Sequence, residues 1–305
     1  MPVFLDAASP DFETRFADLL GAKREDTADV DDIVARIIAD VRRRGDAALI
    51  ELTSKFDRLD LTSAGLRFSP AELDALVAQV PDAERAALEL AAARIRDYHA
   101  RQVPEDASWV EDSGATLGWR WTPVSAAGLY VPGGLASYPS SVLMNAIPAK
   151  VAGVERLAIT VPTPDGKANP LVLLAARIAG VDEIYRIGGA QAIAALAYGT
   201  ETIAPVDMIT GPGNAFVAAA KRRVFGRVGI DMIAGPSEIL VIADRGQNPD
   251  WIALDMLSQA EHDESAQAVL ITDDAQLAAD VRSAIERHLQ TLERRAIAGN
   301  SWRDF

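Results

Sequence analysis

Three glycine-rich segments in the middle of the chain combine room for close backbone approach with a polar side chain. They are Tyr130-Val131-Pro132-Gly133-Gly134, Gly188-Gly189-Ala190-Gln191 and Gly211-Pro212-Gly213-Asn214. Glycine lets a ligand approach the main chain, and the free N–H groups of a helix N-terminus bind phosphate. The three segments therefore predict a ligand site, at the kind of sheet edge where nucleotides bind, to which Tyr130, Gln191 and Asn214 contribute side chains; the segments alone do not name the ligand.

Each segment taken alone has a simpler interpretation. Glycine serves tight turns, Asn214 caps the helix that follows it, and Tyr130 is partly buried. The third segment nearly matches the dinucleotide fingerprint, but Phe216 stands where a small residue permits close packing of helix on strand. The prediction therefore depends on all three segments meeting at one edge of a sheet.

Gln259 and His262 form a second candidate site. They are three residues apart, so on a helix their side chains share one face. A neutral imidazole is a good Zn²⁺ ligand and a glutamine oxygen is a weaker one. Two ligands do not hold zinc, and a lone histidine among acidic residues is usually solvated. The spacing of Gln259 and His262 therefore makes the pair a candidate for zinc binding but does not establish a zinc site.

Alternating elements position these residues. Apolar strand-like runs at 157–161, 183–187 and 207–210 alternate with alanine-rich helical runs, which indicates a parallel sheet with the three segments at its carboxyl edge. A second alternating section follows Gly235-Pro236-Ser237. It predicts strands at 239–243 and 268–272, a helix at 249–259 and another that ends at Arg294.

The first hundred residues have helical periodicity. Ser69 and Glu72 flank Pro70 as a capping box, a helix is expected over 82–99, and short strands follow from Trp109. The predicted fold is α/β, with two Rossmann-like parallel-sheet domains and a helical N-terminal region. The expected domains are a helical arm at 1–24, a discontinuous first domain at 25–130 plus 237–305, and an inserted second domain at 131–236.

Composition excludes several classes of protein. The net charge of −14 and pI near 4.7 would repel nucleic acid and anionic membranes. The chain has no cysteine, so disulfides and thiolate chemistry are excluded. No basic leader or long apolar run is evident, and a cytoplasmic protein is expected.

Five segments in this order give a specific resemblance: GLYVPGG, GGAQAIAALAYGT, GPGNAFV, AGPSE and LSQAEHD. Over essentially its whole length the chain resembles histidinol dehydrogenase. The resemblance implies oxidation of L-histidinol to L-histidine through histidinal, with two hydride transfers to NAD, a substrate-orienting zinc ion and a homodimer. It implies NAD contacts at Tyr130, Gln191 and Asn214, a substrate contact at Ser237, and zinc ligands at Gln259 and His262 that also touch substrate.

The main departure from the family pattern is that the sequence stops at Phe305. In the family, the region beyond supplies a Glu-His acid/base pair and two further zinc ligands, one of them from the partner subunit. The expectation is a chain without catalytic residues of its own, with an incomplete zinc site and impaired turnover. Two alternatives stay open: a paralogue that oxidises another small polyol or hydroxysulfonate, and a non-catalytic remnant that binds nucleotide or dimerises.

Overall fold

The computed structural model describes residues 2–21, 27–133, 138–233, 235 and 237–304. The chain forms two compact units. The central unit comprises residues 26–234, and the terminal unit combines residues 1–25 with 235–305. Each is described by itself.

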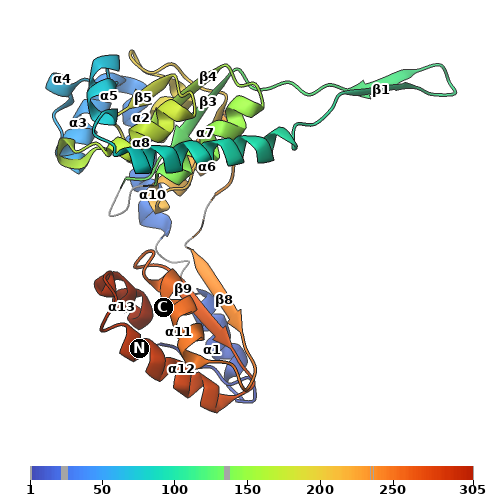
Figure 1. The fold of residues 1–305 in the computed structure, drawn as a ribbon, viewed down its shortest axis with the longest axis vertical. Coiled ribbons are helices and arrows are strands. Elements are labelled where there is room, and N and C mark those ends of the chain that lie inside the picture. Colours follow the sequence, from blue (N-terminus) through green and yellow to red (C-terminus); the bar gives the residue numbers. More distant parts are fainter. Residues whose placement is uncertain (1, 22–26, 134–137, 234, 236, 305) are drawn as a thin grey trace. The chain divides into compact units, whose positions relative to one another are not determined.

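The central unit contains a five-stranded parallel sheet (Figure 1). Its strands are β3 (Ala126–Tyr130), β4 (Arg156–Thr160), β5 (Glu183–Tyr185), β6 (Met208–Thr210) and β7 (Gly229–Ile230). The spatial order is β5-β4-β3-β6-β7, so the first strand of the sheet lies at its centre. This is the Rossmann order, and it confirms the predicted parallel α/β fold. The strand order reverses between β3 and β6, where such sheets bind ligands.

Helices cover both faces of this sheet, and their residues form two apolar cores. Leu129 of β3 belongs to the core that includes α7 and α8, whereas the next residue, Tyr130, belongs to the core of α9 and α10. All five residues of β3 are buried, as expected for a central parallel strand. The helices packed in this unit are α2 (Thr27–Arg44), α3 (Asp46–Asp57), α4 (Leu61–Ala64), α5 (Pro70–Val77), α6 (Asp82–Ala100), α7 (Pro139–Val151), α8 (Pro170–Ile178), α9 (Gly189–Tyr198) and α10 (Ala215–Val224), with the short 3₁₀ turn η1 (Pro164–Gly166).

The domain division predicted from the sequence is wrong for the N-terminal helices. They were expected to cover the second sheet, with residues 25–130 grouped with 237–305. Instead Val34, Ile38 and Val41 of α2 lie in the core shared with α9 and α10. The central unit therefore begins near residue 26, and residues 1–25 are the N-terminal contribution to the discontinuous unit. Helical periodicity reveals an apolar face but does not identify the sheet that covers it.

The terminal unit contains a parallel pair of strands, β8 (Glu238–Ile242) and β9 (Gln267–Ile271), each within one residue of its predicted position. Its helices are α1 (Phe12–Gly21), α11 (Pro249–Ala260), α12 (Ala275–His288) and α13 (Arg295–Asp304). The helix expected to reach Arg294 ends at His288. The described residues of this unit thus show one βαβ element rather than a full Rossmann-like sheet, and Leu240 and Ile242 of β8 are exposed.

An antiparallel hairpin extends from the central unit (Figure 1). It consists of β1 (Ala107–Val110) and β2 (Thr116–Trp119), with the predicted turn glycine, Gly114, at φ 85°. The rings of Trp109 and Trp119 pack edge to face at 5.4 Å, yet both are exposed. Among the described residues, none of the helices is both long and apolar enough to cross a bilayer.

The predicted capping box of α5 is confirmed. The Ser69 hydroxyl accepts the Glu72 N–H at 3.3 Å, and the Glu72 carboxylate accepts the Ser69 N–H at 2.9 Å. The Arg186 guanidinium donates to the same carboxylate at 2.8 Å. These contacts, the arginine above all, lower the pKa of Glu72 from 4.5 to about 2.

The Glu72→Gln substitution tests this cap. Because the folded-state pKa lies below the unfolded value, the stabilisation is present above about pH 4.5 and is lost as pH falls through about 2. We expect the variant to lose about 1 kcal/mol of unfolding free energy at pH 7, since the site is partly exposed. Urea denaturation at pH 7, 4 and 2.5 should show the difference shrinking. The matched variant Glu89→Gln, on the exposed side of α6, should show no such trend, and a pH-independent difference would contradict the account.

Candidate nucleotide-binding site

The loop after β6 approaches the end of β3 so closely that only glycine fits. Gly211 adopts φ +118°, and a Cβ there would lie 2.2 Å from the Tyr130 carbonyl oxygen. Any other side chain would push the two strand ends apart. The contact joins β3 and β6 at the point where the strand order reverses.

Tyr130 and Gln191 meet around the first residue of α9. The buried Tyr130 hydroxyl accepts the Gly189 N–H at 3.1 Å. Gly189 adopts φ +63°, and a Cβ on it would lie 2.8 Å from the amide oxygen of Gln191, which is 3% exposed. Burial raises the pKa of Tyr130, so its hydroxyl stays protonated at neutral pH. The structure thus brings two of the predicted nucleotide contacts together.

Pro162, which follows β4, links the loops that follow β3 and β5. A Cβ on Gly133 would lie 2.4 Å from Cγ of this proline, and one on Gly188 would lie 2.7 Å from its Cβ. Two of the predicted segments therefore pack on one ring, as expected for a common carboxyl edge. Gly134, at the end of the first segment, lies outside the described residues.

Asn214 caps α10. Its side-chain oxygen accepts the Val217 N–H at 3.2 Å, and the residue is exposed. This confirms the capping interpretation of the sequence. A contact between Asn214 and a cofactor stays a prediction, although the residue follows Gly211 by only three positions.

An ion pair between a buried lysine and a partly exposed aspartate, which was not predicted from the sequence, holds the Gly211 peptide. Lys221 of α10 is 2% exposed and donates to the Gly211 carbonyl at 3.0 Å. It also pairs with Asp231, whose carboxylate accepts the Gly211 N–H at 2.9 Å. Both polar groups of this glycine are therefore fixed. The hint in the sequence is a lysine directly after three consecutive alanines, residues 218–220, within α10.

Unpartnered hydroxyls lie along the same edge. Thr160 is the last residue of β4 and Thr210 is the last residue of β6. Thr163 lies three residues after the end of β4. Within the described part of the chain, the buried Oγ1 atom of each lacks a hydrogen-bond partner. A buried polar group without a partner is costly, so such atoms indicate where a ligand can supply one. Together with the glycine loops and the N-terminus of α9, these residues fit a dinucleotide.

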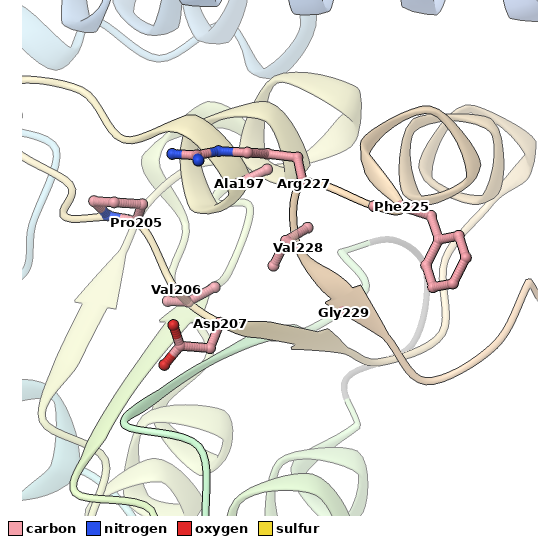
Figure 2. Close-up of a pocket in the computed structure, with 9 residues that line it drawn as sticks. Ala197, Pro205, Val206, Asp207, Phe225, Arg227, Val228 and Gly229 are labelled. Atoms are coloured by element: carbon pink, nitrogen blue, oxygen red, sulfur yellow. The ribbon is translucent and has the colours of Figure 1, made fainter.

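A cavity of about 380 Å³ lies at the other edge of the sheet, where β6 and β7 begin (Figure 2). Its one carboxylate, Asp207, already accepts the Ala126 N–H at 2.9 Å. In Figure 2 the Phe225 ring lies well apart from this carboxylate. The cavity is lined by Ala197, Pro205, Val206, Asp207, Phe225, Gly226, Arg227, Val228 and Gly229, and none of the predicted site residues is among them.

The remaining predicted residues belong to the terminal unit. Ser237 is exposed, its carbonyl accepts the Gln267 N–H at 3.1 Å, and the adjacent Pro236 lies outside the described residues. Gln259 is half-buried in the last turn of α11. His262 is exposed and lies two residues beyond the helix, so the expectation of a shared helix face is wrong in detail. Its N–H donates to the Gln259 carbonyl at 3.0 Å, and in such a three-residue turn the two residues still lie above one another.

This pair does not fit a zinc ion by itself. Structural and catalytic zinc sites use three or four protein ligands. Across the described ranges, no group of three or more His, Cys, Asp or Glu side chains is placed to hold a metal. Gln259 and His262 therefore supply two neutral donors at most, and their role as ligands stays a prediction.

Comparison with known proteins identifies close relatives. Residues 21–305 match the family model described as histidinol dehydrogenase. Histidinol dehydrogenases from Ruegeria pomeroyi and Cereibacter sphaeroides are 77% and 72% identical over all 305 residues, which span 70% of each relative. The crystal structure of histidinol dehydrogenase from Elizabethkingia anophelis superposes with a TM-score of 0.81 at 40% identity, over 89% of this chain and 63% of that one.

Substitutions in the Lys221–Asp231 pair test its importance for the loop. We expect Asp231→Asn to destabilise the protein by about 3 kcal/mol, because it leaves the ammonium buried with only the Gly211 carbonyl. Lys221→Met should cost less, about 1–2 kcal/mol, since the Asp231 carboxylate is 31% exposed and keeps the Gly211 N–H. Urea denaturation measures both. A larger loss of unfolding free energy in Lys221→Met than in Asp231→Asn, or no loss in either variant, would contradict the role of this pair in holding the Gly211 peptide.

Proposed function

The chain belongs to the histidinol dehydrogenase family of oxidoreductases, and from this premise we propose that the protein oxidises L-histidinol to L-histidine through histidinal, passing two hydrides to NAD⁺. The 305 residues span about 70% of their curated relatives, so the activity of the whole protein is part of the proposal. Action in histidine biosynthesis and in the cytoplasm belongs to the same proposal.

The observation that carries the cofactor assignment is the cluster of Tyr130, Gly189 and Gln191 at the carboxyl edge of a Rossmann-ordered sheet. We propose that Tyr130, Gln191 and Asn214 contact NAD⁺. The Tyr130 hydroxyl oxygen accepts the Gly189 N–H, so the O–H of Tyr130 is left to donate to the ligand. The Gln191 amide has both a donor and an acceptor to offer, and Gly211 permits contact with the main chain.

Bound NAD⁺ would supply the hydride acceptor. Tyr130, Gln191 and Asn214 would bind and orient NAD⁺, and we assign none of these three residues the role of acid or base. Because burial raises the pKa of Tyr130, that hydroxyl keeps its proton and acts as a hydrogen-bond donor. Lys221 and Asp231 are engaged with the Gly211 peptide, so they position the loop.

In the terminal unit we propose Ser237, Gln259 and His262 as substrate contacts. Gln259 and His262 are also proposed as two ligands of a zinc site that needs further donors, in line with the family resemblance. The turn that joins them supports a common target, because it sets the two residues above one another. No chemical step is assigned to zinc.

The exposed hairpin supports the proposal of a homodimer. Val110, Trp119 and Trp121 are 68%, 53% and 61% exposed, although two of them are the largest side chains in proteins. Large exposed aromatic groups on a projecting element are typical of surfaces that bind another chain. A second copy of this chain is the partner that the resemblance implies.

NAD⁺ titration tests the cofactor assignment. We expect residues 1–305 to bind NAD⁺, and Gln191→Met to weaken binding about tenfold, because methionine fills the same buried volume without the amide hydrogen bonds. The control Gln79→Met changes an exposed glutamine whose side-chain amide donates to the Ala75 carbonyl, four residues earlier. Calorimetry should show unchanged affinity for this control. Equal affinities for all three proteins would contradict the assignment.

NADH formation from L-histidinol, measured on the same protein, tests whether a chain that binds NAD⁺ can also catalyse the oxidation. Because the described residues place no three metal-ligating side chains together and none of the proposed contacts is assigned as acid or base, turnover should be lower than that of the Ruegeria pomeroyi relative by at least about 10²-fold. Turnover equal to the relative would refute that expectation. Activity confined to other small polyols would favour the paralogue, and NAD⁺ binding without any turnover is also what a nucleotide-binding remnant would show.

A further inference from the structure

The C-terminal end of α3 lies at the carboxyl edge of the central sheet. At its start, Asp46 accepts hydrogen bonds from Thr202, which follows α9. Past its end, Arg58 pairs with Asp165 of η1, which follows β4. The helix therefore runs antiparallel to α9, and its last residue, Asp57, lies at the edge where α9 begins.

The carboxylate of Asp57 lies where it does not stabilise the folded state. Its Oδ2 atom is buried and has no hydrogen-bond partner in the described part of the chain. It occupies the last turn of a helix, where the dipole disfavours a negative charge. Within the described residues, neighbouring Arg58 forms an ion pair with Asp165 rather than with Asp57, and its Nε and Nη2 atoms donate to the Asp165 carboxylate at 2.6 and 2.7 Å.

Electrostatics agrees with this geometry. Burial raises the pKa of Asp57, and the nearby charge of Arg58 only partly opposes the rise. Burial above all raises the pKa of Tyr130, and the Asp57 carboxylate adds to the rise, so its charge acts on the hydroxyl proposed to contact the cofactor. A destabilising charge retained in such a place is typical of a functional residue.

The Rossmann arrangement indicates what this carboxylate binds. An acidic residue after the second strand of such a sheet ordinarily accepts hydrogen bonds from the ribose hydroxyls of NAD. Here β4 is the second strand, and it is followed by Val161, Pro162 and Thr163. The next acid, Asp165, is engaged with Arg58. The segment after Asp57 packs on this same loop, since Leu59 lies 3.6 Å from the place of a Cβ on Gly166.

We propose that Asp57, from outside the strand-and-helix repeat, binds the hydroxyls of the adenosine ribose and so selects NAD⁺ over NADP⁺. The inference rests on the proposed function, because it requires a dinucleotide at this edge. An unpartnered carboxylate accepts hydrogen bonds from two vicinal hydroxyls. It repels the 2′-phosphate that distinguishes NADP⁺, because two negative charges would meet in a partly buried site.

Calorimetric titration of the 305-residue protein with NAD⁺ and with NADP⁺ tests the proposal. The wild type should bind NAD⁺ at least 100-fold more tightly. In Asp57→Asn, affinity for NAD⁺ should fall about threefold to tenfold and affinity for NADP⁺ should rise, so that the ratio drops below about ten. The control Asp112→Asn, in the exposed hairpin, removes the same charge far along the chain and should keep the wild-type ratio.

Thermal unfolding of the same variants separates a binding role from a structural one. Because Asp57→Asn removes an unpaired, partly buried charge, its midpoint should equal or exceed that of the wild type. A lower midpoint with an unchanged NAD⁺/NADP⁺ ratio would assign Asp57 a structural role and overturn the inference. Failure of the wild type to bind either dinucleotide would instead refute the proposed cofactor itself. Wild-type binding of NAD⁺ with equal ratios in both variants would refute only the role of Asp57.

Discussion

The carboxyl edge of the central sheet depends on the contact between Gly211 and Tyr130. At 2.2 Å from the position of a Cβ, the Tyr130 carbonyl excludes every side chain at residue 211. Lys221 and Asp231 then hold both polar groups of that peptide. With the loop held in this way, the end of β3 and the loop after β6 keep their close approach, and the Tyr130 hydroxyl reaches the start of α9.

The cost of this arrangement is visible in the groups left without partners. The hydroxyls of Thr160 and Thr210 and the Oδ2 atom of Asp57 are buried without hydrogen bonds in the described chain. A fold selected for stability alone would replace them with apolar groups or pair them. Their gathering near one sheet edge, opposite the 380 Å³ cavity, is therefore the physical argument for a ligand there. Membership of a dehydrogenase family then identifies a dinucleotide as the ligand to test.

Local features were predictable from the sequence, and long-range pairings were not. Strands β4, β5, β6, β8 and β9, the α5 capping box and the turn at Gly114 follow from periodicity and local chemistry, as does the cap at Asn214. The helices at 27–100 were assigned to the wrong sheet because an amphipathic pattern does not identify its partner. Pro162 and Asp57 were missed for a related reason, because each acts on residues distant in the chain. Lys221 was missed because its partners, each ten residues away, are brought to it only by the fold. His262 was placed on a helix that ends two residues earlier.

Hydrogen–deuterium exchange with and without NAD⁺ tests the central claim, that the dinucleotide binds where the glycine loops meet. The account predicts slower exchange in peptides covering residues 186–191 and 211–217, with no change at 205–207 and 225–229 around the opposite cavity. Protection confined to the cavity peptides, or no protection at saturating NAD⁺, would contradict it.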